Sequence, residues 1–359
     1  MATNKNEFLD YDIPSGTNRG AEAEWPPHKA QTPIFTEWHY WTSILEGTNG
    51  HRYFLFLCDF NCTGDLMKGY IQAVDPSFDV PEGKSAFMFQ TILSDYNTGH
   101  SISDFDASIQ DHDDTFDFET NTKKFRGPKY AVDMTYKGDD VLMKAKGPKY
   151  SVNLTATGGK KVMWAQDQLG IEGLIREGGE NDRSFYYSLP DLPFHGSLSY
   201  EENGEWISTE VTGRGWVDRQ WGDFEAKAWE WSSFRFADGS RVNLYNFAGG
   251  YQVGTYMNED GDCEYFDDFT VYQNGYGKTP DGVWFSHGWD YDLPVKGKKY
   301  TVEPLSKNNI MIAPGNSFFE GIGKLMDENG NQVGWAVNES MDVRVMENAP
   351  GQRFQNNRT

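Results

Sequence analysis

The sequence contains few cysteines, with three among 359 residues. Cys58, Cys62 and Cys263 are too few for a disulfide framework. Cys58 and Cys62 lie close together in sequence, but no second pair completes a zinc site. We therefore expect the cysteines to be small packing residues in or beside strands, and we expect no metal.

Positive charge and long apolar runs are also scarce. The chain has 32 Lys and Arg against 54 Asp and Glu, which gives a formal net charge of -22. Phosphate binding needs clustered Lys and Arg, so this balance argues against nucleic acid and anionic membranes as partners. No segment approaches the ~20 apolar residues of a membrane-spanning helix, and we expect no stable membrane insertion.

A secretory signal is not visible either. Residues 1–20 lack a basic start followed by an apolar run, so the sequence favours a cytoplasmic protein. Secretion after removal of a signal stays open. The sequence does not distinguish a monomer from a homodimer.

Several common catalytic motifs are missing. There is no HExxH, no Walker loop and no GxGxxG after a strand. Residues 99–103 lack the second glycine of a serine-hydrolase elbow. We interpret the acidic stretches 111–114 and 258–264 as surface loops, and His195 and His287 as structural residues.

Aromatic residues and turn signals are abundant instead. Phe, Trp and Tyr make up 15% of the chain, and helical periodicity is weak, with residues 317–326 ambiguous. Asn-Gly and Asp-Gly pairs between alternating segments are strong hairpin signals. They occur at Asn49-Gly50, Asn203-Gly204, Asp238-Gly239, Asp260-Gly261, Asn274-Gly275, Asp281-Gly282 and Asn329-Gly330. We therefore predict an all-β fold of two antiparallel barrels or closed sheets.

Internal similarity favours a duplicated plan. Residues 127–135 recur as 147–155, and the hairpin that begins at Trp38 has a loose echo that begins at Trp229. We predict an extended arm over residues 1–30, barrels over 31–195 and 196–348, and a flexible tail over 349–359.

A charged pair lies between two tryptophans in the segment Trp216-Val217-Asp218-Arg219-Gln220-Trp221. Because side chains alternate along a strand, Asp218 should share a face with Trp216, and Arg219 should share the other face with Trp221. A carboxyl group buried among rings has a raised pKa and can serve as a general acid. The alternative is a structural Asp218 paired with an arginine.

Three sets of residues resemble the AttH and carotenoid 1,2-hydratase family (hydroxyneurosporene synthase, kievitone hydratase-like). They are Glu37-Trp38-His39-Tyr40, Tyr186-Tyr187-Ser188, and the run Gly213-x-Gly215-Trp216-Val217-Asp218-Arg219-Gln220-Trp221-Gly222 with the following Trp229-x-Trp231 and Asp238-Gly239. The resemblance implies tandem lipocalin-like (calycin) β-barrels with a hydrophobic cavity. It also implies water addition to an isoprenoid double bond, and a distant relation to fungal lipocalin-like Diels–Alderases. None of these reactions needs a redox cofactor, so we expect none.

Two departures from the family pattern matter. Arg219 stands where the family often has histidine, and the strand with Tyr245 and Phe247 lacks the family's carboxylate. The proton donor must then come from elsewhere, and Asp218 is the nearest candidate.

We predict an enzyme of secondary metabolism that acts on a C=C bond of a hydrophobic isoprenoid or polyene molecule. A hydratase leads, with a Diels–Alderase-type cyclase and a non-catalytic lipid or pigment carrier as alternatives. The predicted catalytic residues are Asp218 and Tyr245. The predicted substrate-binding residues are Trp38, Tyr40, Trp216, Trp221, Trp229, Trp231 and Phe247.

Overall fold

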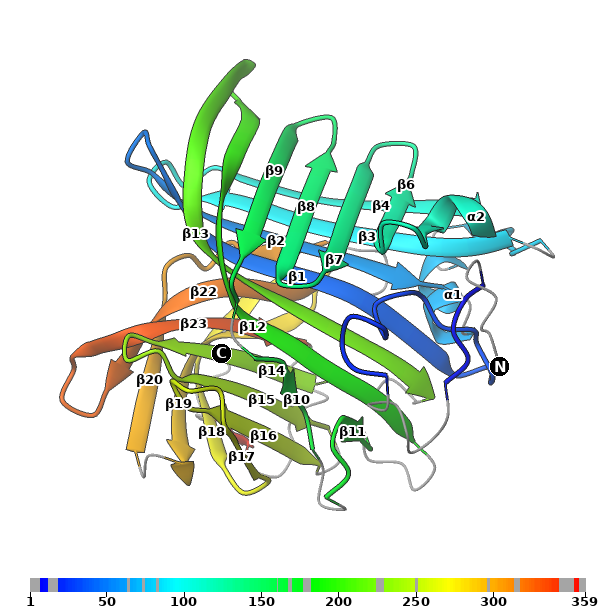
Figure 1. The fold of residues 1–359 in the computed structure, drawn as a ribbon. Coiled ribbons are helices and arrows are strands. Elements are labelled where there is room, and N and C mark those ends of the chain that lie inside the picture. Colours follow the sequence, from blue (N-terminus) through cyan, green and yellow to red (C-terminus); the bar gives the residue numbers. More distant parts are fainter. Residues whose placement is uncertain are drawn as a thin grey trace. The chain divides into compact units, whose positions relative to one another are not determined.

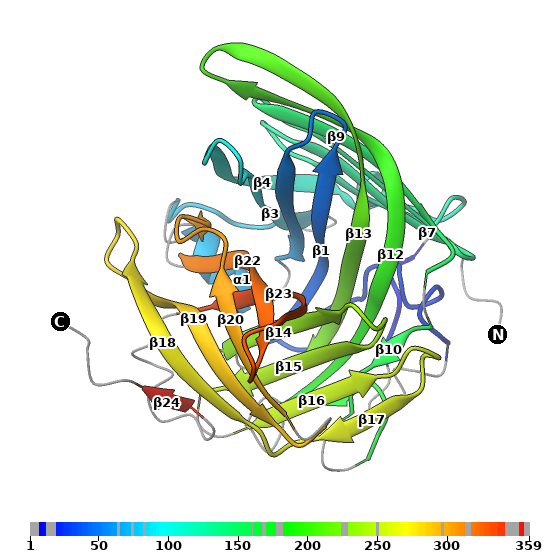
Figure 2. The ribbon, with the colours of Figure 1, turned by 90° about the vertical axis from the view of Figure 1, so that its left-hand side faces the viewer.

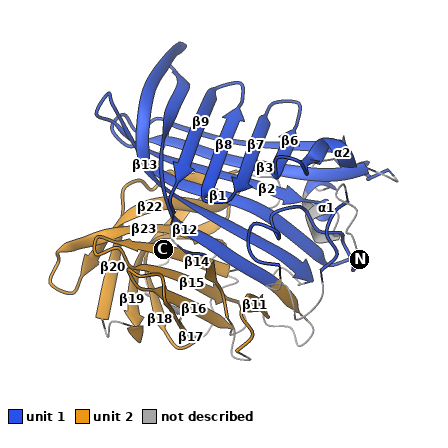
Figure 3. Ribbon diagram, viewed as in Figure 1, with its two compact units in different colours: residues 1–162, 185–223 blue, residues 163–184, 224–359 orange. Residues whose placement is uncertain are grey.

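The computed structural model describes residues 7–11, 19–62, 65–72, 75–81, 84–159, 161–166, 170–176, 182–223, 229–248, 251–295, 298–312, 317–341 and 352–354. These residues form two compact units, coloured separately in Figure 3: unit 1 holds residues 1–162 and 185–223, and unit 2 holds 163–184 and 224–359. The chain leaves unit 1 after residue 162, returns at residue 185 and leaves again after residue 223. Residue 195, near which we expected the joint, lies inside a strand, Arg183–Glu202.

Unit 1 is built on one curled antiparallel sheet with the strand order β4-β3-β2-β1-β13-β12-β9-β8-β7-β6-β5 (Figure 1). Its strands are β1 (Phe35–Gly47), β2 (Arg52–Asn61), β3 (Lys84–Asp95), β4 (Ser101–Asp111), β5 (Phe116–Asp117), β6 (Thr122–Arg126), β7 (Ala131–Lys137), β8 (Asp140–Lys146), β9 (Tyr150–Thr157), β12 (Arg183–Glu202) and β13 (Glu205–Asp223). Two short helices accompany them, α1 (Asp65–Gln72) and α2 (His112–Thr115). The predicted loop at 111–114 thus contains most of α2.

The turn between β12 and β13 shows why its sequence forms a hairpin. Asn203 and Gly204 have φ angles of 55° and 86°. Positive φ at both central residues is the signature of the type I′ turn, which matches the twist of paired strands and favours Asn-Gly. The two longest strands of the chain therefore form one hairpin, green in Figure 1.

The repeat predicted at 127–135 and 147–155 is structural. Gly127 N donates to Tyr130 O at 2.9 Å, and Gly147 N donates to Tyr150 O at 2.8 Å. The same turn thus precedes β7 and β9, and β8 lies between these two strands in the sheet.

The two ends of the unit 1 sheet curl toward each other. Asp106 on β4 accepts hydrogen bonds through Oδ2 from the backbone N–H groups of Lys129 and Tyr130, at 2.9 and 3.0 Å, just before β7. Inside the curl, the Phe89 ring packs 5.2 Å from both the Phe125 and the Tyr130 rings. A carboxylate that satisfies two backbone donors and a core of stacked rings together hold this sheet curved.

Unit 2 is built on a second curled sheet with the order β17-β16-β15-β14-β23-β22-β20-β19-β18-β24, in which β21 pairs with β22 (Figure 2). The strands of this unit are β10 (Met163–Trp164), β11 (Leu174–Ile175), β14 (Trp229–Phe236), β15 (Arg241–Phe247), β16 (Gln252–Met257), β17 (Cys263–Phe266), β18 (Thr270–Lys278), β19 (Trp284–Leu293), β20 (Lys298–Pro304), β21 (Ile310–Met311), β22 (Phe318–Asp327), β23 (Gln332–Ser340) and β24 (Gln352–Phe354). The stretch 317–326, ambiguous in sequence, is mostly β22. The strand β24 lies in the predicted tail 349–359, whose other residues fall outside the described ones.

One predicted turn of unit 2 is wrong. Asn274-Gly275 lies inside β18, where the pairing with β19 shifts register on both sides of Gly275. A Cβ atom on Gly275 would come within 2.7 Å of the His287 ring. The glycine therefore permits a bulge and a close ring contact, not a chain reversal.

The all-β prediction is confirmed in both units, each of which is a curled, largely antiparallel sheet. Within the described part of the chain, neither helix has the length and apolarity needed to cross a bilayer.

Candidate functional site

The face of β13 that carries Asp218 is set by its pairing with β1. Tyr40 lies directly opposite Asp218, Trp38 opposite Gln220, and Thr42 opposite Trp216. Directly opposed residues of antiparallel strands share a face. The register therefore brings four predicted site residues, Trp38, Tyr40, Trp216 and Asp218, to one face, which we call the Asp218 face.

Asp218 is held by donors from two strands. Its Oδ1 atom accepts a hydrogen bond from the Ser188 hydroxyl of β12 at 2.6 Å and another from Trp216 Nε1 at 2.6 Å. The Tyr186 hydroxyl lies 2.9 Å from Ser188 Oγ. Asp218 is only 3% exposed. The arrangement fixes one carboxylate oxygen and links it to a chain of two hydroxyl groups.

Aromatic side chains flank this carboxylate. The Trp38 ring lies 5.8 Å from Phe60, and the Tyr40 ring lies 5.5 Å from Phe56. Trp38 and Tyr40 are 7% and 5% exposed. Aromatic residues on the same face as a carboxylate can serve chemistry that develops positive charge, because ring faces attract cations.

Gln90 continues the same face across two further strands. In register, Asp218 lies opposite Tyr40, Tyr40 opposite Cys58, and Cys58 opposite Gln90. Gln90 is fully buried, and neither of its side-chain polar atoms has a hydrogen-bond partner among the described residues. A buried amide without a partner is uncommon in folded proteins.

The opposite face of β13 carries an ion pair. Arg219 Nη2 donates to Glu37 Oε1 at 2.7 Å, and both side chains are buried. His28 Nδ1 lies 2.8 Å from the same Glu37 oxygen, and its ring stacks on Trp221 at 4.6 Å and 3°. Trp221 is therefore on the face away from Asp218. Arg219 thus pairs with Glu37 and not with Asp218. The predicted alternation of side chains along β13 is confirmed.

Burial and charge act against each other in this cluster. Burial alone would raise the pKa of Glu37, but the charge of Arg219 and hydrogen bonds from His28 and Arg219 outweigh it and lower that pKa to about 2. His39, which shares the face, has a pKa well below its ordinary value because of burial and the nearby charge of Arg219. Glu37 is thus ionised and His39 neutral near neutral pH.

A second buried pair lies in the same unit. Lys123 Nζ is 2.7 Å from Asp59 Oδ2, and both side chains are 2% exposed. Burial raises the pKa of Asp59 and lowers that of Lys123. Asp59 of β2 lies directly opposite His39 of β1. Since His39 shares its face of the sheet with Glu37 and Arg219, Asp59 lies on that face too. We call Glu37, Arg219, Asp59 and Lys123 the inner charged cluster.

Unit 2 has an aromatic face of its own. Trp229 lies opposite Phe247 and Trp231 opposite Tyr245. The Tyr245 and Phe247 rings stack at 5.3 Å and 11°. Glu230 points to the other face, where its Oε1 atom accepts hydrogen bonds from Gln273 and from Ser340. The register therefore brings four more predicted site residues together within unit 2.

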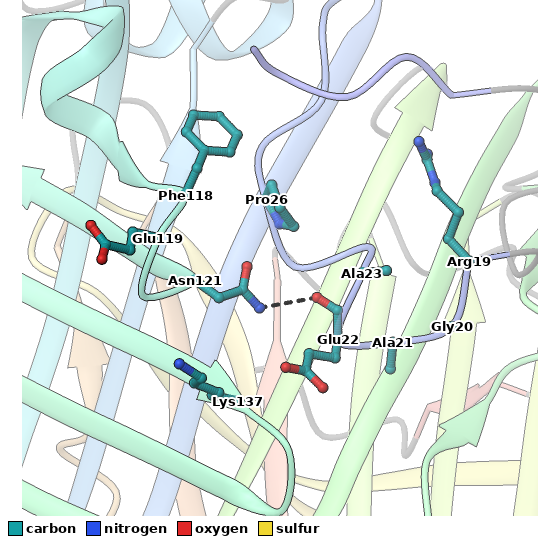
Figure 4. Close-up of a pocket in the computed structure, with 10 residues that line it drawn as sticks. All are labelled: Arg19, Gly20, Ala21, Glu22, Ala23, Pro26, Phe118, Glu119, Asn121 and Lys137. Carbon is teal, nitrogen blue, oxygen red and sulfur yellow. Dashed lines mark hydrogen bonds between the residues drawn. The ribbon is translucent and has the colours of Figure 1, made fainter. Parts of the chain in front are cut away.

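An open hollow of about 550 Å³ lies elsewhere on unit 1, where residues 19–26 cross the edge of the sheet (Figure 4). Arg19, Glu119 and Lys137 line it, and Asn121 Nδ2 donates across it to Glu22 O at 3.1 Å. None of the predicted site residues is part of its lining. Among the described residues, no group of His, Cys, Asp and Glu side chains is arranged to hold a metal ion.

The model of the AttH-like family matches residues 18–339. The chain belongs to the AttH-like family. The resemblance to this family drawn from the sequence is therefore confirmed, and the match reaches from the first strand of unit 1 to β23 of unit 2.

Two solved structures resemble this AttH-like protein. An AttH protein from Nitrosomonas europaea has a TM-score of 0.66 at 18% identity, covering 87% of this chain and 94% of the other. Kievitone hydratase from Nectria haematococca has a TM-score of 0.62 at 12% identity, covering 85% and 88%. At these identities the likeness establishes the fold. No curated protein sequence matches the chain.

Sequence reasoning missed several polar residues of this AttH-like chain. Ser188 and Glu37 stand in the motifs that carry the resemblance, but nothing local shows what they bind. Asp59, Lys123 and Gln90 carry no motif. Their partners, or the lack of them, become visible only when the strand register is known.

Proposed function

We propose that this AttH-like protein is a hydratase that adds water across a C=C bond of a hydrophobic isoprenoid or polyene-type molecule. The observation that carries the proposal is Asp218, a buried carboxylate fixed by Ser188 and Trp216 on a face lined with aromatic rings. Kievitone hydratase, which shares the fold, supports the reaction type.

The proposed reaction is a proton transfer followed by water addition. Protonated Asp218 gives its proton to one alkene carbon, and the π electrons form the new C–H bond. The other carbon becomes a carbocation that the faces of Trp38, Tyr40 and Trp216 stabilise. Water adds to the cation and loses a proton, which returns to the Asp218 carboxylate. The sum is addition of one water, with no change of oxidation state overall, so it requires no redox cofactor.

The hydroxyl chain supports the return of the proton. Tyr186 and Ser188 link in sequence to Asp218 Oδ1, at 2.9 and 2.6 Å. Each hydroxyl both donates and accepts, so a proton can pass along the chain without movement of the backbone. General-acid help of this kind contributes a factor of about 10²–10⁴ in rate.

The aromatic residues of unit 2 keep their predicted roles in the proposal. For unit 2 by itself, we propose that Trp229, Trp231 and Phe247 bind a substrate molecule and that Tyr245 is a catalytic residue. Trp221 was predicted to bind substrate, but its stacking on His28, on the face away from Asp218, favours a packing role.

Turnover in ¹⁸O-labelled water tests the reaction type. The purified protein is incubated with a panel of prenylated phenols, acyclic isoprenoids and polyenes, and products are analysed by mass spectrometry. We expect a product that gains one water and carries the label. A cyclase gives a product of unchanged mass without label, and a carrier releases the probe unaltered. Either result contradicts the proposal.

A further inference from the structure

One hairpin of unit 1 projects beyond the strands on either side of it. Along β12, pairing with β9 reaches Tyr200, and along β13, pairing with β1 begins at Val211. The residues between these two points extend past the rest of the sheet, as the green hairpin in Figures 1 and 2 shows. We call residues 201–210 the hairpin tip; their sequence is Glu-Glu-Asn-Gly-Glu-Trp-Ile-Ser-Thr-Glu.

The hairpin tip carries an exposed tryptophan. The chain has 12 tryptophans, all within the described residues, and Trp206 alone among them is exposed, to 55%. The others are buried or partly buried. Tryptophan is enriched among the residues that contribute most to protein–protein binding, because its large ring fills a pocket on the partner. Trp206 is therefore placed as an anchor for another molecule.

The charge of the hairpin tip has one sign. The tip contains no Lys or Arg, and its acidic residues are Glu201, Glu202, Glu205 and Glu210. Within the described part of the chain, none of these four carboxylates forms an ion pair. By contrast, Glu46 at the end of β1 pairs with Arg52 at 2.6 Å. The carboxylates of the tip are thus available to cations from outside the chain.

The turn brings two of these carboxylates face to face. A two-residue turn at 203–204 places Glu202 directly opposite Glu205. The next opposed pair is Glu201 and Trp206, so the Glu201 carboxylate shares a face with the indole ring. Like charges directly opposite each other destabilise a hairpin. A bound cation would remove this repulsion.

The hairpin tip has a defined conformation without a partner. Ser199 Oγ lies 2.8 Å from Ser208 Oγ across the two strands, which agrees with that register. At the base of the tip, Thr209 Oγ1 lies 3.2 Å from Thr48 Oγ1, and Thr48 N donates to Glu210 O at 2.9 Å. An element that is already ordered loses less conformational freedom when it binds.

We propose that the hairpin tip is a docking site for a partner protein and that it binds an arginine-rich segment of that partner. One guanidinium group stacks on the face of Trp206, and others pair with Glu201, Glu202 and Glu205. Arginine fits better than lysine, because its planar group both stacks on rings and pairs with carboxylates through two hydrogen bonds. The same carboxylates repel phosphate groups, which argues against nucleic acid and anionic lipid as the occupant.

None of the residues proposed to act in hydration lies in the hairpin tip, so the docking site and the reaction can fail separately. Two labelled peptides test the docking site on the full chain. One has about five arginines that alternate with serines, and the other has citrulline, which is similar in shape but uncharged, in place of each arginine. Fluorescence anisotropy measures their dissociation constants in 0.15 M NaCl, where charges more than about 8 Å apart are largely screened.

We expect the wild-type protein to bind the arginine peptide about tenfold more tightly than the citrulline peptide, since several exposed charge contacts together are worth about that factor. Trp206→Ala should weaken binding of the arginine peptide about two- to fivefold, the value of one exposed cation–π contact. The double variant Glu202→Gln with Glu205→Gln should weaken it by a similar factor. This double variant should melt at the wild-type temperature or higher, because the like-charge repulsion is gone.

Asp139→Asn with Asp140→Asn is the matched control. It removes two charges from another exposed turn of unit 1 and should leave the dissociation constant unchanged. Equal binding of both peptides by the wild type, or binding of neither, overturns the proposal. Equal losses in the two double variants with no effect of Trp206→Ala also overturn it, because net charge alone would then attract the peptide.

Two further measurements exclude other occupants of the hairpin tip. Sedimentation without peptide should show the same association state for the wild type and Trp206→Ala. A wild-type oligomer that Trp206→Ala dissociates would assign the tip to a second copy of the chain and overturn the proposal. Binding to phosphatidylcholine vesicles that depends on Trp206 would assign the tip to a lipid surface, with the same consequence.

Discussion

The charge of Glu37 contributes to the folding stability of unit 1. Its carboxylate is buried between Arg219 and His28, and its pKa is lowered to about 2. Since the ordinary value is 4.5, the folded state holds the ionised form more strongly than the unfolded state does. This contribution is present above pH 4.5 and is lost as the pH falls toward 2.

Glu37→Gln should therefore destabilise the protein by about 3–5 kcal/mol at neutral pH, because Arg219 is left buried without a countercharge. Urea unfolding at a series of pH values measures this. The difference between wild type and variant should shrink below pH 4.5, because the carboxyl group of Glu37 then takes up a proton in the unfolded state, while the folded state keeps it ionised down to about pH 2. Glu46→Gln removes a half-exposed pair with Arg52 and should cost less than about 1 kcal/mol. Equal effects of the two substitutions would contradict this account.

The Asp59–Lys123 pair makes a separate prediction. Lys123→Met alone should cost about 3–5 kcal/mol, because it leaves Asp59 buried without its partner. The double variant Asp59→Val with Lys123→Met should recover most of that loss, because well-packed apolar residues often replace a buried pair without cost. Chemical denaturation of the single and double variants measures the coupling. Additive losses would show that the pair does not act as a unit.

At the scale of elements, two glycines differ in whether their surroundings leave room for a side chain. A Cβ atom on Gly213 of β13 would lie 2.1 Å from the Ile44 carbonyl oxygen of β1, whereas a Cβ on Gly69 of α1 would meet nothing within 4 Å. Gly213→Ala should therefore lower the melting temperature, since the main chain of β1 has to move. Gly69→Ala should raise stability by about 0.5–1 kcal/mol, as in other helix interiors. Thermal unfolding compares them, and equal shifts would count against the close strand approach.

Sequence reasoning worked where structure is local. Asn203-Gly204 predicted its hairpin because the turn type demands positive φ at both residues. Strand alternation placed Asp218 with Trp216 and away from Arg219, as the hydrogen bonds and the register confirm. The turn predicted at Asn274-Gly275 was wrong because a glycine in a strand can also mark a bulge.

Sequence reasoning failed where partners are distant along the chain. Glu37 and Arg219 are 182 positions apart, so no window of sequence shows that they pair. Ser188 stands 30 positions before Asp218, and only the pairing of β12 with β13 brings them together.

At the scale of the whole molecule, the net charge of -22 dominates. Self-repulsion destabilises a compact state that carries an excess of one sign, and salt screens it over a Debye length of about 30 Å at 0.01 M and 8 Å at 0.15 M. The melting temperature should rise between these two NaCl concentrations. Calorimetry measures this, with a neutral osmolyte as the control. A falling melting temperature would contradict a role of net charge in stability.

Family membership and fold are established, while the reaction is a proposal that rests on particular residues. The AttH-like match extends over residues 18–339, which include all of the unit 1 sheet and the unit 2 sheet up to β23. Folds of this kind serve several chemistries, so the proposal depends on what Asp218 does.

Turnover by Asp218→Asn tests that role most directly. Asparagine keeps the shape and can still accept from Ser188 and Trp216, but it cannot donate and recover an acidic proton. On a probe that the wild type hydrates, we expect kcat to fall by about 10²–10⁴, with folding unchanged by circular dichroism. Asp191→Asn, which removes a partly exposed pair with Arg214, should keep the wild-type rate. A folded Asp218→Asn protein with wild-type turnover would contradict the account.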